Sequence, residues 1–133
     1  MALPHQILGI NYHYCAPAKS DWAGLKGVTP ELFERHLATL DTKFVPFSLA
    51  ELPKSNKGVT TNSLGCLITF DDGIKGIVEY ALPILERYRF PVIIFCCAIP
   101  YTEGRVLNVQ KTHLLQGRWG WDDFRAKFMS ALA

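Results

Sequence analysis

The sequence predicts an α/β fold with mainly parallel strands. Residues 64–70 and 91–98 are short apolar runs of the kind that forms buried strands. Between them, residues 74–88 carry apolar side chains at helical spacing. Strands that are apolar along their whole length are typical of parallel sheets covered on both faces. With 133 residues, of which 49% are hydrophobic, the chain can bury one core, so we expect residues 1–133 to form one domain.

The first elements have recognisable ends. Residues 7–14 are apolar and aromatic, which predicts a strand ending near His13. Thr29 followed by Pro30 is a helix start, with Thr29 as N-cap and Pro30 at the first helical position. The apolar spacing that follows predicts a helix ending near Asp41.

The middle of the chain is less regular. Residues 44–46 are consistent with a short strand, and Ser48 with Glu51 three residues later is a second helix-start signal. Residues 53–63 have the composition of a loop throughout.

The remaining helices and turns are predicted from the positions of proline, glycine and acidic residues. Pro83 should kink the helix predicted at 74–88 or move its effective start. The chain should turn at 102–104, and residues 122–132 predict a final helix.

Composition limits the partners and the compartment. The net charge is only +2 and the 14 basic residues are scattered, so nucleic acid is not an expected partner. No apolar stretch approaches the ~20 residues of a membrane span. The four cysteines form no CxxC pair, which predicts small buried side chains in a reducing compartment: Cys15, Cys66, Cys96 and Cys97. Residues 1–6 lack the features of a signal peptide, so we expect a cytoplasmic protein.

Two adjacent carboxylates carry the chemical signal. Asp71 and Asp72 follow a predicted buried strand, at the end where α/β sheets place their ligands, and Gly73 permits a tight turn. Two ionised carboxylates so close repel each other unless a cation or hydrogen-bond donors stabilise both, and a divalent metal is the simplest stabiliser. Asp-Asp-Gly is also a common turn signal, so these three residues alone fit a plain strand-to-helix connection as well.

The surrounding sequence favours the functional interpretation. The run Thr69-Phe70-Asp71-Asp72-Gly73 resembles the first motif of the polysaccharide deacetylase family, carbohydrate esterase family 4, whose domain is also called the NodB-homology domain. The likeness covers roughly residues 7–100 and extends to four further segments: 11–14, 29–33, 82–85 and 91–95.

The resemblance implies a role for each carboxylate. It implies a partial (β/α) barrel-like deacetylase fold and the removal of acetyl groups from an acetylated sugar or polysaccharide. Asp71 matches the general base for water, and Asp72 matches a ligand of the divalent metal, commonly zinc but also cobalt or nickel. Such a metal would polarise the acetyl carbonyl and lower the pKa of a bound water.

The sequence also departs from the family. The His-Ser/Thr-x-x-His motif that completes the metal site is absent, and the four histidines are isolated: His5, His13, His36 and His113. We therefore expect only the amino-terminal part of a deacetylase-like domain, with weak metal affinity. Missing strands predict exposed sheet edges, and with them either a homo-oligomer or a missing C-terminal segment as partner.

Histidine and tryptophan residues leave alternatives open. His13 is expected near Asp71, where it either contacts substrate or metal or is a hydrogen-bonded structural residue. Trp22, Trp119 and Trp121 suit stacking on a sugar ring, but core or interface packing is the favoured interpretation.

Two other function classes compete with the hydrolase. A catalytically inactive carbohydrate-binding or assembly module would keep the same fold. A receiver-like phosphoacceptor domain also clusters acids at a strand end, but the run 91–98 lacks the following aspartate that such domains need.

Overall fold

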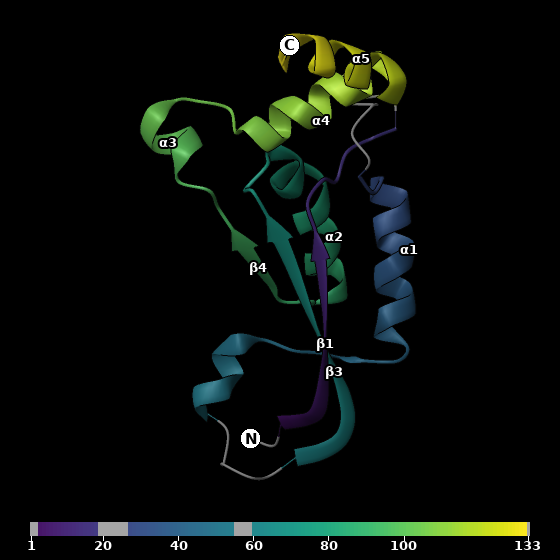
Figure 1. Cartoon of the computed structure of the whole chain (residues 1–133). Coiled ribbons are helices and arrows are strands. Elements are labelled where there is room, and N and C mark those ends of the chain that lie inside the picture. The colour runs from purple at the N-terminus through teal and green to yellow at the C-terminus, as the bar shows by residue number, and fades with distance from the viewer. Residues whose placement is uncertain (1–2, 19–26, 55–59, 133) are drawn as a thin grey trace.

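The computed structural model describes residues 3–18, 27–54 and 60–132 and has an α/β architecture (Figure 1). Its elements, in chain order, are β1 (Leu3–Tyr12), α1 (Pro30–Asp41), β2 (Val45–Pro46), the 3-10 helix η1 (Leu49–Lys54), β3 (Thr60–Asp71), the π-helical turn η2 (Ile77–Ala81), α2 (Leu82–Tyr88), β4 (Val92–Phe95), α3 (Ile99–Glu103), α4 (Asn108–Trp119) and α5 (Trp121–Leu132).

The sheet is built around β3, and all its pairings are parallel. β1 runs along one side of β3, with Ile10 beside Ile68 and Asn11 beside Thr69. β2 and β4 pair with successive parts of the other side. The predicted α/β class with parallel strands is therefore confirmed.

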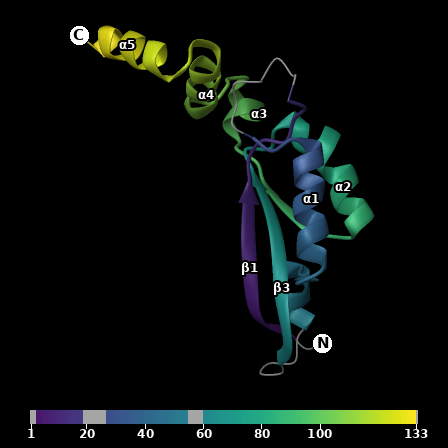
Figure 2. The same ribbon diagram turned by 90° about the vertical axis from the view of Figure 1, so that its right-hand side faces the viewer.

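The core lies between one face of this sheet and the helices α1 and α2, as Figure 2 shows. Alternate residues of β3, namely Cys66, Ile68 and Phe70, point into it and are fully buried. Phe33 and Leu37 of α1 meet them with no exposed surface. Each such large apolar side chain contributes about 1.5–3 kcal/mol by leaving water, so this layer fixes the position of β3.

Helix α1 begins where its sequence signals it. Thr29 has extended backbone angles, and its hydroxyl accepts a hydrogen bond from the backbone N–H of Leu32 at 3.2 Å. Pro30 occupies the first turn, where its missing N–H has no cost. The predicted cap and both predicted ends are confirmed.

Pro83 moves the start of the following α-helix, as predicted. The backbone N–H of Leu82 bonds the carbonyl of Ile77, five residues back, which makes the preceding turn π-helical. α2 then starts at Leu82 with Pro83 in its first turn. The wide turn accommodates a proline ring that would clash inside a regular α-helix.

Some boundaries differ from the prediction. Residues 60–63, predicted as loop, are the start of β3, because they lie alongside the beginning of β1, where Leu3 pairs with Thr60. The strand predicted at 91–98 ends at Phe95. Helices α3 and α4 were not predicted. Polar residues can form a strand when a neighbouring strand supplies backbone hydrogen bonds. The local pattern of apolar and polar residues does not show which strand is the neighbour.

The cysteine prediction is right for two residues and wrong for two. Cys15 and Cys66 are buried, and burial raises the pKa of the Cys15 thiol to about 11. Cys96 is exposed and Cys97 is half-buried, because β4 ends before them at the carboxyl edge of the sheet. All four thiols are free.

The second face of the sheet is open. Residues that alternate with the core positions point to it, and they include Ile7, Leu67, Ile93 and Phe95. Phe95 is 56% exposed. Within the described ranges, no helix or strand covers this face (Figure 2).

The C-terminal helices also expose large aromatic side chains. Among the described elements α5 has its main packing contacts with α4 and points away from the sheet (Figure 2). Trp119 is partly exposed and Trp121 is 63% exposed, so neither is a core residue. Trp22 lies outside the described residues. Within the part of the chain that is described, none of the helices has both the length and the apolar character needed to cross a bilayer.

The open face predicts self-association. We expect the chain to elute above its monomer mass, because apolar side chains around Phe95 lack a covering layer. Phe95→Lys should shift the mass measured by light scattering toward the monomer, since it places a charge on that face. Val78→Lys adds the same charge at an exposed position on the helix side and should leave the mass unchanged. A wild-type monomer with a sharp melting transition would contradict the prediction.

Candidate active site

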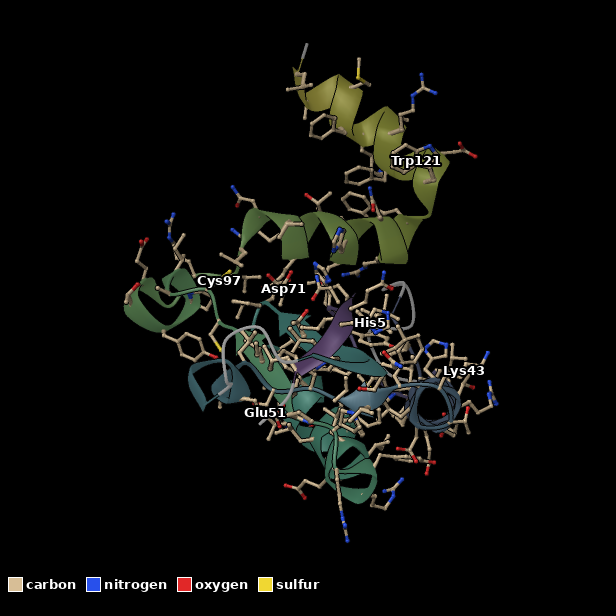
Figure 3. The ribbon with its side chains drawn as sticks, turned by 90° about the horizontal axis from the view of Figure 1, so that it is seen from below. His5, Lys43, Glu51, Asp71, Cys97 and Trp121 are labelled. Carbon is tan, nitrogen blue, oxygen red and sulfur yellow. The ribbon has the colours of Figure 1, made fainter. Side chains whose placement is uncertain are left out.

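The carboxyl ends of β1 and β3 bring three polar side chains together. Asp71 is the last residue of β3, Asn11 is near the end of β1, and His13 follows β1 directly. His13 Nε2 lies 3.6 Å from Asp71 Oδ2. Figure 3 shows Asp71 on the side of the sheet away from Lys43, which follows α1, and this is the open face.

A chain of two hydrogen bonds holds Asp71. The Thr69 hydroxyl donates to Asn11 Oδ1 at 2.9 Å, and Asn11 Nδ2 donates to Asp71 Oδ2, also at 2.9 Å. Among the described residues, all side-chain partners of the Asp71 carboxylate contact Oδ2. Its Oδ1 has no side-chain partner among these residues, and the Asp71 side chain is 35% exposed.

Asp72 has different surroundings because the chain turns at once. Asp72 has a φ of 70° and Gly73 a φ of 64°, the successive positive angles of a tight Asp-Gly turn. The turn takes Asp72 out of the strand alternation and toward the end of β4. There the Cys97 thiol donates to Asp72 Oδ1 at 3.7 Å.

Two features of the turn require glycine at position 73. A positive φ is costly for residues with a Cβ. In addition, a Cβ at this position would lie 2.7 Å from the Cys96 sulfur and 3.3 Å from the Tyr101 hydroxyl. The Tyr101 hydroxyl donates to the Gly73 carbonyl at 3.4 Å, which links the turn to α3.

A cavity of about 620 Å³ lies beside Asp72. It is mainly apolar and aromatic, and its side chains come from the loop after β1, from the turn after β3 and from the C-terminal helices: they include Tyr14, Asp72, Tyr80, Tyr101, Val106 and Leu114. Asp71 is not part of this lining. The two carboxylates therefore face different spaces.

Helix α4 supplies a contact that the sequence did not reveal. His113 Nδ1 and the Tyr14 hydroxyl form a hydrogen bond of 3.1 Å, which ties α4 to the loop after β1. Burial raises the pKa of Tyr14, and the negative charge of Asp72 raises it further. No role for His113 was predicted from the sequence, because its partner is 99 residues away.

The remaining histidines lie elsewhere. His36 bonds the Tyr12 hydroxyl at 3.1 Å beside the core, and His5 Nδ1 lies 3.1 Å from the Ser63 carbonyl oxygen at the far end of the sheet. Within the described ranges, His13 is the histidine placed beside a carboxylate of the turn.

The described residues do not by themselves fit the expected metal. Zinc sites use at least three protein ligands. Across residues 3–18, 27–54 and 60–132, no group of three or more His, Cys, Asp or Glu side chains is placed to hold a metal ion. Asp71 pairs with His13 and Asp72 with Cys97, in two separate pairs. The metal therefore stays a prediction.

Comparison with known proteins identifies relatives of the fold. No family model and no curated protein matches the chain. The solved structures that match include the Streptococcus pyogenes deacetylase PplD in complex with acetate, with 20% identity and a TM-score of 0.57, and IcaB from Ammonifex degensii, with 19% identity and a TM-score of 0.61. The alignments cover 86% and 89% of this chain, but 54% and 52% of those chains. The chain thus has the fold of about half of each protein, and the expected partial barrel-like fold is confirmed.

Substitution of Gly73 separates backbone strain from steric contact. Gly73→Ala should lower the free energy of unfolding by more than Gly104→Ala, measured by urea denaturation. Both glycines have a positive φ, which costs about 1 kcal/mol for alanine, but a Cβ at Gly104 meets no atom within 4 Å. Adding Cys96→Ala should recover part of the difference. Equal losses for both glycines would show that the contact with Cys96 is unimportant.

Thiol labelling reports the contact between Cys97 and Asp72. Desolvation raises the pKa of the Cys97 thiol, and the charge of Asp72 raises it further. In a Cys96→Ser background, Asp72→Asn should therefore accelerate labelling of Cys97 severalfold at pH 8, because more thiolate forms. Asp41→Asn, at an exposed helix end, is the control for a lost carboxylate. Unchanged labelling in the Asp72 variant would mean that the two side chains do not interact in solution.

Proposed function

We propose that this chain carries part of a deacetylase that hydrolyses the acetyl group of an acetylated sugar or polysaccharide. The observation that carries the proposal is the way the two carboxylate oxygens of Asp71 are bonded. Its Oδ2 is held by Asn11 and its Oδ1 has no partner among the described side chains, at the end of a strand where α/β folds place their sites. The fold shared with a deacetylase bound to acetate, together with the motif 69–73, supports this choice of reaction.

Asp71 is proposed as the general base. A water molecule beside Oδ1 would give its proton to the carboxylate as its oxygen adds to the acetyl carbonyl carbon. The carbon–nitrogen bond then breaks, the proton passes to the leaving amine, and acetate is released. His13, on the same rim, is proposed to contact the substrate.

The proposal includes a divalent metal ion, with Asp72 as one of its ligands. Asp72 would supply one ligand to a divalent ion, zinc most readily and cobalt or nickel as alternatives. The other ligands must come from outside the described residues, which offer no complete set. A site that needs further ligands predicts weak metal binding by this chain alone.

The cavity beside Asp72 suits a carbohydrate, and because Asp71 is not part of its lining, the acetyl group of a sugar bound there would have to extend to Asp71. Its volume of about 620 Å³ falls within the usual range for small-molecule pockets. Tyr14, Tyr80 and Tyr101 contribute aromatic rings to its lining, and such rings suit the apolar face of a pyranose. The small net charge of the chain also suits a neutral sugar.

A second candidate is a carbohydrate-binding or assembly module without catalytic activity. It is the alternative for the case that no ligands from outside the described residues join Asp72 in a metal site. Such a module would bind a carbohydrate in the cavity without hydrolysing its acetyl group.

Acetate release from acetylated chito-oligosaccharides, with added zinc or cobalt, distinguishes the two candidates. We expect slow release that Asp71→Asn lowers by about a hundredfold or more, since the base is lost. Asp41→Asn is the matched control and should keep full activity, because Asp41 is exposed at the end of α1. Binding of the oligosaccharide without any acetate release, by this chain and by any longer product of its gene, would favour the silent module.

A further inference from the structure

We infer that Asn11, held in place by Thr69, is a positioning residue that orients the Asp71 carboxylate. The hydrogen bonds themselves are independent of any reaction. Their importance for catalysis rests on the proposed function, in which Asp71 accepts a proton.

The sheet register places the three residues side by side. Asn11 pairs with Thr69 across the parallel strands β1 and β3, and Asp71 lies two residues further along β3. Side chains two residues apart in a strand share a face, so Thr69 and Asp71 both point to the open face, and Asn11 reaches between them.

The Asp71 carboxylate only accepts hydrogen bonds, so it requires the Nδ2 end of the Asn11 amide, and Thr69 holds the other end. The Thr69 hydroxyl donates to Asn11 Oδ1 at 2.9 Å, so the Nδ2 group is turned toward Asp71 Oδ2, also at 2.9 Å. The reversed amide would place an acceptor against the carboxylate and lose that hydrogen bond, whereas the Thr69 hydroxyl could donate to the amide oxygen in one orientation or accept from the N–H in the other. Asp71 therefore selects the amide orientation, and Thr69 anchors the amide in the position from which Asn11 donates to it.

The arrangement makes the two carboxylate oxygens unequal. Oδ2 receives the Asn11 N–H and lies 3.6 Å from His13, whereas Oδ1 has no partner among the described side chains. A neutral amide fixes the carboxylate plane without adding a positive charge that would weaken the base. Small errors in the position of a reacting group are costly for the rate, so this restraint should affect turnover.

The same hydrogen bonds contribute little to the stability of the fold. Asn11 is exposed, and the bonds lie on the face away from the core of Cys66, Ile68 and Phe70. Solvent replaces exposed hydrogen bonds at small net cost. Losing them should therefore change the rate much more than the melting temperature.

The kinetic experiment uses Asn11→Ala, Thr69→Val and Thr69→Ser in the full chain. The first two should lower kcat for acetate release by about tenfold or more, with KM and the melting temperature nearly unchanged. Thr69→Ser keeps the hydroxyl and should retain most of the activity. The double variant should be no slower than Asn11→Ala, because both changes break one chain of contacts.

Matched control residues lie at the other end of β3. Asn62→Ala and Thr61→Val make the same side-chain changes at exposed positions near the start of β3, and kcat should not change. A loss of kcat that is matched by an equal loss of stability, or equal effects in the controls, would overturn the inference.

A second measurement does not depend on activity. The side-chain amide resonances of Asn11, assigned by NMR, should shift when Asp71→Asn removes the charged acceptor and when Thr69→Val removes the donor. Asn11 amide resonances whose chemical shifts are unchanged in both variants would overturn the inference. If neither this chain nor any longer product of its gene releases acetate, the proposed function is contradicted, and the amide resonances alone decide whether Asn11 holds Asp71.

Discussion

Burial of alternate side chains on β3 is the constraint on which the site depends. Cys66, Ile68 and Phe70 must face α1 and α2 to leave water, and a strand alternates its faces with a period of two. Thr69 and Asp71 consequently point to the open face. A slip of one residue would bury Asp71 and expose the core, so the packing that stabilises the sheet also fixes where the carboxylate points.

The turn after β3 separates two carboxylates that are neighbours in sequence. Positive φ angles at Asp72 and Gly73 end the alternation, and the side chain of Asp72 meets Cys97 and the cavity instead of the open face. Asp71 has Asn11 and His13 beside it. Two residues of the same type thus have different partners, which suits a division between a proton acceptor and a metal ligand.

Local signals in the sequence predicted the parts that depend on local physics. The cap at Thr29, the effect of Pro83 and the strand before Asp71 follow from backbone geometry and apolar spacing, and the structure confirms them. The position of His13 beside Asp71 followed from the common edge of parallel strands. Asn11 was missed because its role depends on register, and His113 because its tyrosine partner is distant in sequence.

The candidate site lies on the open face of the sheet. Asp71 and Asn11 lie on the face that no described element covers, next to apolar residues such as Phe95, which pairs with Asp71 in the sheet. A layer that covered Phe95 would therefore stand directly beside the carboxylate. The same layer would remove water from the hydrogen bonds of Asp71 and strengthen them. Any segment that packed on this face, from this chain or another, would therefore contact the surroundings of Asp71 as well as Phe95.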